Sequence, residues 1–496
     1  YDVLPYHWDD QEKAFNDFNY LQNLNKILLP ILSRKLNQVH NQNYTDRQWN
    51  LLFGYWLTQF TAVVFDRYTS IINAKIINKN FETKIVLNNQ ENLVPNDSSE
   101  AGIYFHSNDL WNHNLYGFII ENCTDFKINY ISDNELNFKI NDNLESFNRN
   151  GIKQLIKKFV FKLSMNFGKN NNVFFSSPGL NLSKYINLNL RLKQSPSFLF
   201  FPKIPKYPYK ENLRDWNLDD YQYKSEFESI LIKLIPSFIP KIFLEGFENL
   251  DMVGDKIKLP KSPKIIFTTK DHLSNDLFKI WSMKKINTST KLIIGQHGSG
   301  AHLRYNGAMS YEHLICDKYL LSGEHSHKKG EKYIKIGQLF NHLKKRGYNP
   351  KGKGVLITTC LPRYTYDFRS MPMSGQMLSY FNQQFTFYNA LPKDIKKQFI
   401  IRLYHHDYKW YQKNRWKENF SNVQFDKNIK MEKIIYKSRL SIHTYAATTY
   451  NQTLAANIPT IIYWNKSLWE LESESDYYFK LLEEVGIFHT SPISAA

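Results

Sequence analysis

Two short segments carry residues that could do chemistry, and the first follows an apolar run. Residues 295–300 read GQHGSG and come directly after the apolar run LII. Glycines let backbone N–H groups approach a ligand closely, and a histidine at the carboxyl end of a strand can act as a general base or hydrogen-bond a phosphate or hydroxyl. The alternative is a tight turn whose histidine caps local backbone. We favour a catalytic role for His297, with Gln296 and Gly298 beside it on the acceptor side.

The second segment, residues 443–449, reads HTYAATT between the strand-like run RLSI and an expected helix over 448–457. Small and hydroxyl-bearing residues at a helix N-terminus favour a phosphate, because unsatisfied N–H groups and the positive helix end face it. The alternative is ordinary N-capping by Thr448 or Thr449. His443, Thr444, Thr448 and Thr449 are therefore candidate donor-binding residues.

Arg402 follows another strand-forming run, in QFIIRLYHHD. A guanidinium there could pair bidentately with a diphosphate or a sugar carboxylate. His405, His406 and Asp407 come next, but no second cluster has metal-like spacing, so we predict no metal site. A solvated loop explains the histidine pair equally well.

A polar cluster, HWDD, lies near the start of the sequence at residues 7–10. Asp9 and Asp10 could cap the helix that follows, or could act as a general base for an acceptor hydroxyl with His7 beside them. The neighbouring pair Asp66 and Arg67 follows an apolar helical run and is expected to be a buried ion pair.

The elements around these segments change character along the chain. Helical spacing of apolar residues predicts helices over 9–40 and 45–72, the second capped by Thr45 and Asp46. Residues 80–150 are Asn-rich and are predicted to be irregular, with short strands at 84–87 and 126–131. A basic helix is expected over 152–167 and a strand at 173. That helix could lie on an anionic membrane, or pack on the core with a wet basic face.

From residue 226 onward, strands and helices alternate, which predicts parallel sheets. Strands are expected at 263–269, 291–295 and up to 323, and then at 354–360, 398–404, 423–425, 439–445 and 459–464. Helices are expected between them and near 477. A basic segment rich in Gly and Pro at 341–354 is the best linker. We therefore predict an α/β fold with two Rossmann-like domains, 1–345 and 346–496, facing a cleft, and a helical N-terminal part.

Composition narrows the class of protein. The 496 residues carry a net charge of +18, with lysines spread along the chain rather than clustered, and no nucleic-acid-binding motif is visible, so no nucleic-acid partner is predicted. Three cysteines, odd in number and far apart, argue against a disulfide framework and fit a reducing cytosol. No run is long enough to span a bilayer. A cytoplasmic location is expected, with an anionic membrane surface as a further partner, and both ends look trimmed.

Seven stretches, in order along the chain, resemble a family of transferases encoded in bacterial O-antigen and other surface-carbohydrate clusters. They are LPYHWDD (4–10), KLNQVHN (35–41), RQWNLLFGYWL (47–57), VFDRY (64–68), IIGQHGSG (293–300), TLAANIPTIIYW (453–464) and FHTSPISAA (488–496). The resemblance implies a GT-B-like glycosyltransferase that needs no cofactor, takes a nucleotide-sugar donor and acts on a glycan or lipid-linked glycan acceptor. Among donors it favours a nonulosonic acid carried by CMP.

The resemblance also adds residues around the last nucleotide-binding helix. It implies donor-binding roles for Gln452, Thr453 and Asn457. Relatives often carry a Glu where this chain has Gln452, which puts a ribose-binding role there in doubt. Two other functions remain open: a glycerophosphotransferase-type enzyme of cell-surface polymer synthesis, and a non-enzymatic protein that binds polyanions through its positive surface.

Overall fold

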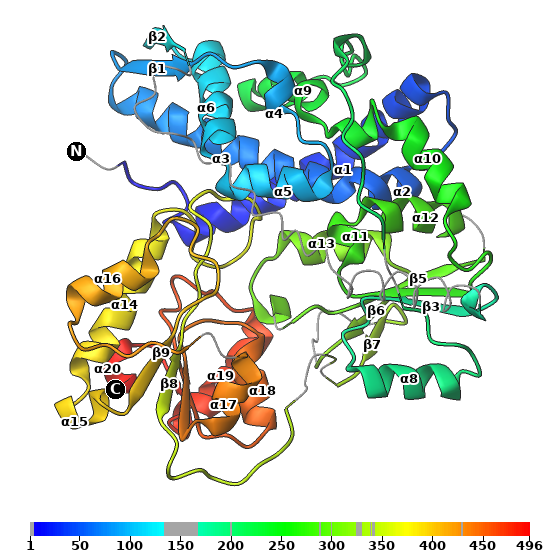
Figure 1. Cartoon of the computed structure of the whole chain (residues 1–496). Coiled ribbons are helices and arrows are strands. Elements are labelled where there is room, and N and C mark those ends of the chain that lie inside the picture. The colour runs from blue at the N-terminus through cyan, green and yellow to red at the C-terminus, as the bar shows by residue number, and fades with distance from the viewer. Residues whose placement is uncertain are drawn as a thin grey trace. The chain divides into compact units, whose positions relative to one another are not determined.

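The computed structural model describes residues 4–132, 167–198, 201–286, 289–298, 300–323, 330–337, 339, 343–427 and 430–496. The fold is mixed α/β, with parallel sheets and many helices (Figure 1). The chain forms two compact units, one of residues 1–295 and 307–320, and the other of residues 296–306 and 321–496. The predicted basic helix over 152–167 lies, apart from its last residue, outside the described residues.

The first unit begins with long helices whose boundaries follow from side-chain caps. Helix α1 (Gln11–His40) starts at Asp10, whose carboxylate accepts hydrogen bonds from two backbone N–H groups, and ends at Asn41 in the left-handed conformation. Its apolar stripe is buried, as the spacing predicted. Thr45 and Gln48 form a capping box at the start of α2 (Asp46–Trp49). A π-helical turn, η1 (Asn50–Gly54), then leads into α3 (Tyr55–Ile77).

The Asn-rich segment after α3 is more regular than predicted. Strands β1 (Glu82–Val86) and β2 (Lys127–Ile131) pair in parallel, which confirms the two strand-like runs. Between them lie α4 (Gln90–Leu93), α5 (Ser98–Ser107) and α6 (Asp109–Cys123), where an irregular chain was expected. The side chains of Asn89, Asp97 and Asn108 cap these three helices, so polar residues that suggested loops mark helix starts.

The larger sheet of this part of the chain runs in strict sequence order, β3-β4-β5-β6-β7. Its strands are β3 (Val173–Ser176), β4 (Ile265–Thr268), β5 (Lys291–Gly295), β6 (Lys318–Leu321) and β7 (Tyr333–Lys335). The paired registers of β3 to β6 are parallel. The helices are α8 (Leu182–Arg191), η3 (Glu211–Leu213), α9 (Glu226–Phe238), η4 (Lys241–Phe243), α10 (Phe247–Lys256), α11 (Asp271–Ser274), α12 (Asp276–Ile286) and α13 (Gly307–Ile315).

The second unit contains a five-stranded parallel sheet in which successive strands add first on one side of β8 and then on the other. The order is β12-β11-β10-β8-β9, formed by β8 (Gly354–Ile357), β9 (Phe399–Arg402), β10 (Leu440–His443), β11 (Thr460–Tyr463) and β12 (Phe488–His489). Because β9 lies on one side of β8 and β10 on the other, the order switches between β8 and β10. A switch of this kind opens a crevice beyond the carboxyl ends of the two strands.

The helices of this unit largely match the predicted alternation. They are η5 (Gly300–His302), α14 (Gln376–Ala390), α15 (Lys393–Lys396), α16 (Gln412–Asn419), α17 (Met431–Lys437), α18 (Thr448–Ala455), α19 (Ser473–Glu484) and α20 (Pro492–Ala495). The strand predicted at 423–425 is wrong: Phe425 makes only an isolated bridge to Ile401. This short run lies beside β9 but is not long enough to form a ladder.

A short segment, residues 296–306, belongs to the second unit and is called the strap here. Leu303 forms an antiparallel bridge with Leu471, and the N–H of Glu472 donates to the carbonyl of His302. The predicted domain boundary between 345 and 346 therefore lies inside the second unit as the contacts define it. Gln296, His297 and Gly298, which were predicted on the N-terminal side, therefore lie in the same unit as α18.

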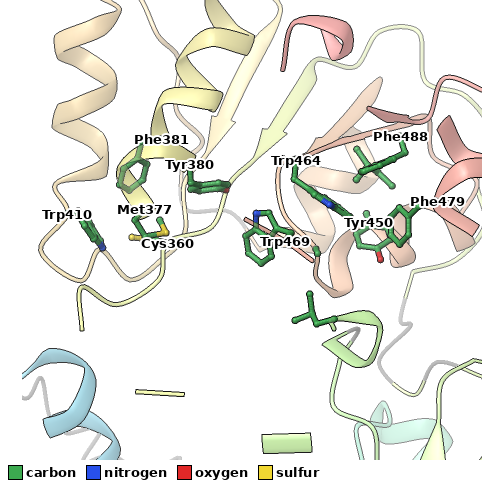
Figure 2. Packing of buried hydrophobic residues seen from close by; sticks show 13 residues of the cluster. Cys360, Met377, Tyr380, Phe381, Trp410, Tyr450, Trp464, Trp469, Phe479 and Phe488 are labelled. Carbon is green, nitrogen blue, oxygen red and sulfur yellow. The ribbon is translucent and has the colours of Figure 1, made fainter. Parts of the chain in front are cut away.

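An aromatic cluster fills one side of the second unit (Figure 2). Phe381, Met377, Cys360 and Trp410 gather at one end of the view, and Tyr450, Trp464, Phe479 and Phe488 at the other. Tyr380 and Trp469 lie between the two groups, and Leu303 of the strap also belongs to the cluster. Burial of this much aromatic surface gives a rigid base on which the strand ends and α18 are held.

Candidate functional site

A network of hydroxyl groups joins the carboxyl ends of β8 and β10. The N–H and hydroxyl of Thr444 both donate to the carbonyl of Ile357, at 3.4 and 3.1 Å. The hydroxyl of Tyr380 lies 2.6 Å from that of Thr444, and the N–H of Thr359 donates to the Tyr380 oxygen at 2.9 Å. Thr444 is buried and joins the two strand ends. Tyr380 was not singled out from the sequence, because its role depends on α14 packing across the sheet.

Helix α18, which follows β10 in the chain, begins without a side-chain cap. Its N-cap residue is Ala447, which makes no capping hydrogen bond. The alternative interpretation of residues 448–449, N-capping by Thr448 or Thr449, is therefore wrong. Capping hydroxyls and carboxylates normally satisfy the first N–H groups of a helix, and an alanine cannot. The N-cap side chain therefore does not satisfy the first N–H groups of α18, at the end of the helix that attracts anions.

The strap turn packs directly on the first residue of α18. Gly298 has a φ of +76°, and a Cβ atom built on it would lie 2.6 Å from the hydroxyl oxygen of Thr448. Gln296 is buried and holds the turn, because its amide donates to the Gly298 carbonyl at 2.8 Å and accepts from the N–H of Ser322 at 2.9 Å. His297 is exposed beside it. Two segments that sequence reasoning singled out separately therefore meet at one place.

His443, at the end of β10, and Thr453, within α18, belong to one buried polar cluster. The Nε2 atom of His443 is 3.0 Å from the Ser441 hydroxyl and 3.2 Å from that of Thr453, which also accepts from Thr460 at 3.0 Å. Among the described residues, Nδ1 of His443 has no hydrogen-bond partner. Burial lowers the pKa of His443 to about 3, so the ring is neutral at physiological pH. Gln452 lies within α18, and Asn457, which follows the C-cap residue Ala456, has a φ of +57°.

The depressed pKa of His443 predicts a pH dependence of stability. Because the folded pKa is about 3 and the unfolded value is near 6.5, its contribution is complete above pH 6.5 and is lost as the pH falls below that value. The expected slope is about 1.4 kcal/mol per pH unit between the two values. Urea denaturation at pH 7, 5.5 and 4.5 should show a flatter dependence in His443→Asn than in the wild type. An equal slope in both would contradict the assignment, and exposed His405→Asn serves as the control.

Arg402 lies at the end of β9, as predicted, but its charge is already engaged. Its Nη1 atom pairs with the carboxylate of Asp426, while its Nε is buried without a hydrogen-bond partner among the described residues. The side chains of His405 and His406 are exposed, and Asp407 caps α16 by accepting from the N–H groups of Tyr411 and Gln412 at 2.7 and 2.8 Å. No group of three or more His, Cys, Asp or Glu side chains in the described residues could hold a metal ion.

The predicted N-terminal residues lie in the first unit. Asp10 caps α1, accepting from the N–H groups of Glu12 and Lys13 at 2.9 and 3.0 Å, and Asp9 is exposed. His7 is buried, with Nε2 3.3 Å from a carboxylate oxygen of Asp66. Asp66 also forms a buried ion pair with Arg67 at 2.5 Å, as expected.

The comparison with known families decides the broader class. A family model, described as the LIC12162 family transferase, matches residues 1–496. The chain belongs to the LIC12162 family of transferases. No curated protein matches it significantly. Membership of the LIC12162 family identifies the chain as a transferase. In the described part of the chain, no helix is long and apolar enough to cross a membrane.

Proposed function

We propose that this LIC12162-family protein is a GT-B-type glycosyltransferase that binds a nucleotide-sugar donor on its second unit. The observation that carries the proposal is the uncapped start of α18, packed against the glycine turn of the strap at the switch point of a parallel sheet. Phosphates bind where helix N–H groups and a glycine-rich backbone converge at such a point. Thr448 and Thr449 stand in the first turn, where their hydroxyls could contact the same anion.

This arrangement supports separate roles for α18 and His297 in sugar transfer. The acceptor hydroxyl attacks the anomeric carbon of the donor, and the bond from that carbon to the phosphate oxygen breaks with the electron pair leaving on the nucleotide. The start of α18 would stabilise the negative charge that develops on this leaving phosphate. An exposed imidazole at His297 would take the proton from the hydroxyl. Asp9 is the second candidate base, whereas the Asp10 carboxylate accepts two helix N–H groups.

The proposed donor is a CMP-linked nonulosonic acid and the acceptor is a bacterial surface polysaccharide or its lipid-linked precursor, with the reaction on the cytoplasmic side of an anionic membrane. Support for these finer assignments comes from the sequence resemblance, since the site geometry favours a phosphate without selecting a base or a sugar. Arg402, at the end of β9, would not meet the donor as a free cation, because Asp426 already pairs with it.

A thermal-shift screen against CMP, UDP, GDP, dTDP, ADP and CDP-glycerol tests the proposal. A nucleotide at a hundred times its dissociation constant should stabilise the folded protein by about 2.7 kcal/mol. Ala447→Asp supplies the missing helix cap and should increase the free energy of unfolding of the free protein by about 0.5–2 kcal/mol, which raises its melting temperature. The negative charge of the aspartate should remove the nucleotide-induced shift.

Ala447→Ser is the matched control, because it caps α18 without adding charge and should retain most of the nucleotide response. An unchanged response in Ala447→Asp would show that the nucleotide binds elsewhere. A response to CDP-glycerol alone would favour the transfer of glycerol phosphate instead of a sugar. No response to any nucleotide would reject the donor site.

A further inference from the structure

The first unit contains a cavity that no part of the proposed donor site uses. Its volume is about 660 Å³, within the range of small-ligand pockets. Its walls come from the segment around α4, from α5 and the start of α6, from residues 206–208, and from Lys241 at the start of η4. All of these residues belong to the first unit.

Hydrogen bonds tie the cavity walls together, and the walls are rich in groups that recognise hydroxyls. Asn96 is buried and ties two walls together, because its amide donates to the Pro205 carbonyl and accepts from the N–H of Tyr207, both at 2.9 Å. Asn88 adds an amide nitrogen that is buried and has no hydrogen-bond partner among the described residues. Amides, carboxylates and aromatic rings around one cavity can bind the alternating polar edges and apolar faces of a sugar ring.

Lys241 gives the cavity a cation without a partner. Its side chain is half-buried, and its ammonium makes no ion pair or hydrogen bond in the described part of the chain. Its backbone is fixed, since its N–H donates to the Pro95 carbonyl at 2.9 Å and its carbonyl accepts from Gly246 at 2.8 Å. Burial lowers its pKa, against the weaker opposing influence of Glu91 and Glu245. An ammonium held in this way is stabilised when an anion binds beside it.

Among the described residues, the carboxylates near Lys241 attract its charge but make no ion pair with it. Glu100 lines the wall, but its carboxylate accepts the N–H of Asn96. Glu91 is exposed, so water screens its charge, and Lys206 adds a second ammonium to the lining of the cavity. The two carboxylates can accept hydrogen bonds from sugar hydroxyls while the lysines face an acidic group.

We propose that this cavity binds a saccharide that carries an acidic group, with Lys241 pairing with that group and the amides of Asn88 and neighbouring residues binding the hydroxyls. Its use as the acceptor-glycan site rests on the proposed glycosyltransferase function, whereas the binding itself does not. The acidic group can be a carboxylate or a phosphate, because both pair with an ammonium.

Ligand-observed saturation-transfer NMR on the full chain tests the proposal with three sugars of one scaffold: glucose, glucuronic acid and glucose 6-phosphate. The two acidic sugars should bind saturably and at least about tenfold more tightly than glucose, since a charge-assisted hydrogen bond is worth that much. The stronger of the two identifies the acidic group. Lys241→Met should remove the difference, and Lys241→Arg should retain most of it.

Lys256→Met, at an exposed position outside the cavity, is the control for a general loss of positive charge. Melting curves establish that each variant is folded. Equal binding of glucose and the acidic sugars, or equal losses in Lys241→Met and Lys256→Met, would overturn the proposal. Because the nucleotide response is measured separately and depends on the second unit, its failure would remove the acceptor assignment without affecting saccharide binding.

Discussion

Gly298→Ala is expected to abolish the nucleotide response and to lower the transfer rate about 100-fold, because displacements of about 1 Å at a site have effects of that size. A side chain at a φ of +76° is strained by about 1–2 kcal/mol. In addition, its Cβ would lie 2.6 Å from the Thr448 hydroxyl, so either the strap turn or the start of α18 must move. Thermal shift with the nucleotide found in the screen, and the rate of transfer, measure the effect.

Two further variants separate contact from backbone strain. Gly486→Ala lies in the same unit at a φ of +70°, with no atom within 4 Å of the added Cβ, so it introduces the strain without the contact and should leave both readouts unchanged. In the double variant Gly298→Ala/Thr448→Ala the clashing hydroxyl is gone, so part of the nucleotide response should return relative to Gly298→Ala alone. A fully active Gly298→Ala protein would show that the strap turn does not position the donor site.

Arg67→Met is expected to destabilise the first unit by about 3–5 kcal/mol, because it leaves a buried carboxylate without its main counter-charge. The Arg67 side chain is fully buried, and it also donates to Asn112 at 2.8 Å and to the Phe105 carbonyl at 3.3 Å. Burial raises the pKa of Asp66, but Arg67, His7 and Tyr6 outweigh it and hold the pKa below its usual value. Urea denaturation followed by tryptophan fluorescence measures the loss.

The pH dependence distinguishes this electrostatic effect from a loss of packing. In the wild type, the lowered pKa of Asp66 means that its contribution is present above the unfolded pKa of about 4 and is lost as the pH falls below it. In Arg67→Met the folded pKa should rise instead, so the defect should shrink between pH 7 and pH 5 as Asp66 takes up a proton. A defect independent of pH would indicate packing alone. Lys127→Met, which breaks an exposed pair with Glu82, should leave stability almost unchanged, because water screens that pair.

The local signals in the sequence predicted much of each unit. Apolar periodicity placed α1 and the parallel strands, and the capping residue Thr45 marked a helix start correctly. Polar residues were harder to interpret where they had two uses, as at Asn89 and Asn108, which cap helices in a segment predicted to be irregular. The same ambiguity applied to Thr448 and Thr449, because composition alone does not show whether a hydroxyl or an alanine occupies the N-cap.

The meeting of the strap turn with α18 was beyond sequence reasoning for a different reason. About 150 residues separate Gly298 from Thr448, and their contact depends on the bridge between Leu303 and Leu471 and on the hydrogen bond from Glu472 to His302. Neither partner carries a periodic signal that identifies the other. The predicted residues of the candidate site were therefore found as separate segments, and only the fold assembled Gln296, Gly298 and Thr448 at one place.

The path of the chain has a consequence for how this protein can be dissected and how it is completed during synthesis. The polypeptide passes from one unit to the other after residues 295, 306 and 320, so neither unit is a continuous stretch of sequence. A fragment that begins at residue 346 would lack the strap, and with it Leu303, which belongs to the aromatic cluster. Such a fragment would expose part of that cluster and would associate non-specifically with other apolar surfaces. On the ribosome, residues 296–306 are synthesised long before α18 and Leu471, with which they pack. The nascent second unit is therefore incomplete for longer and is a candidate for chaperone binding.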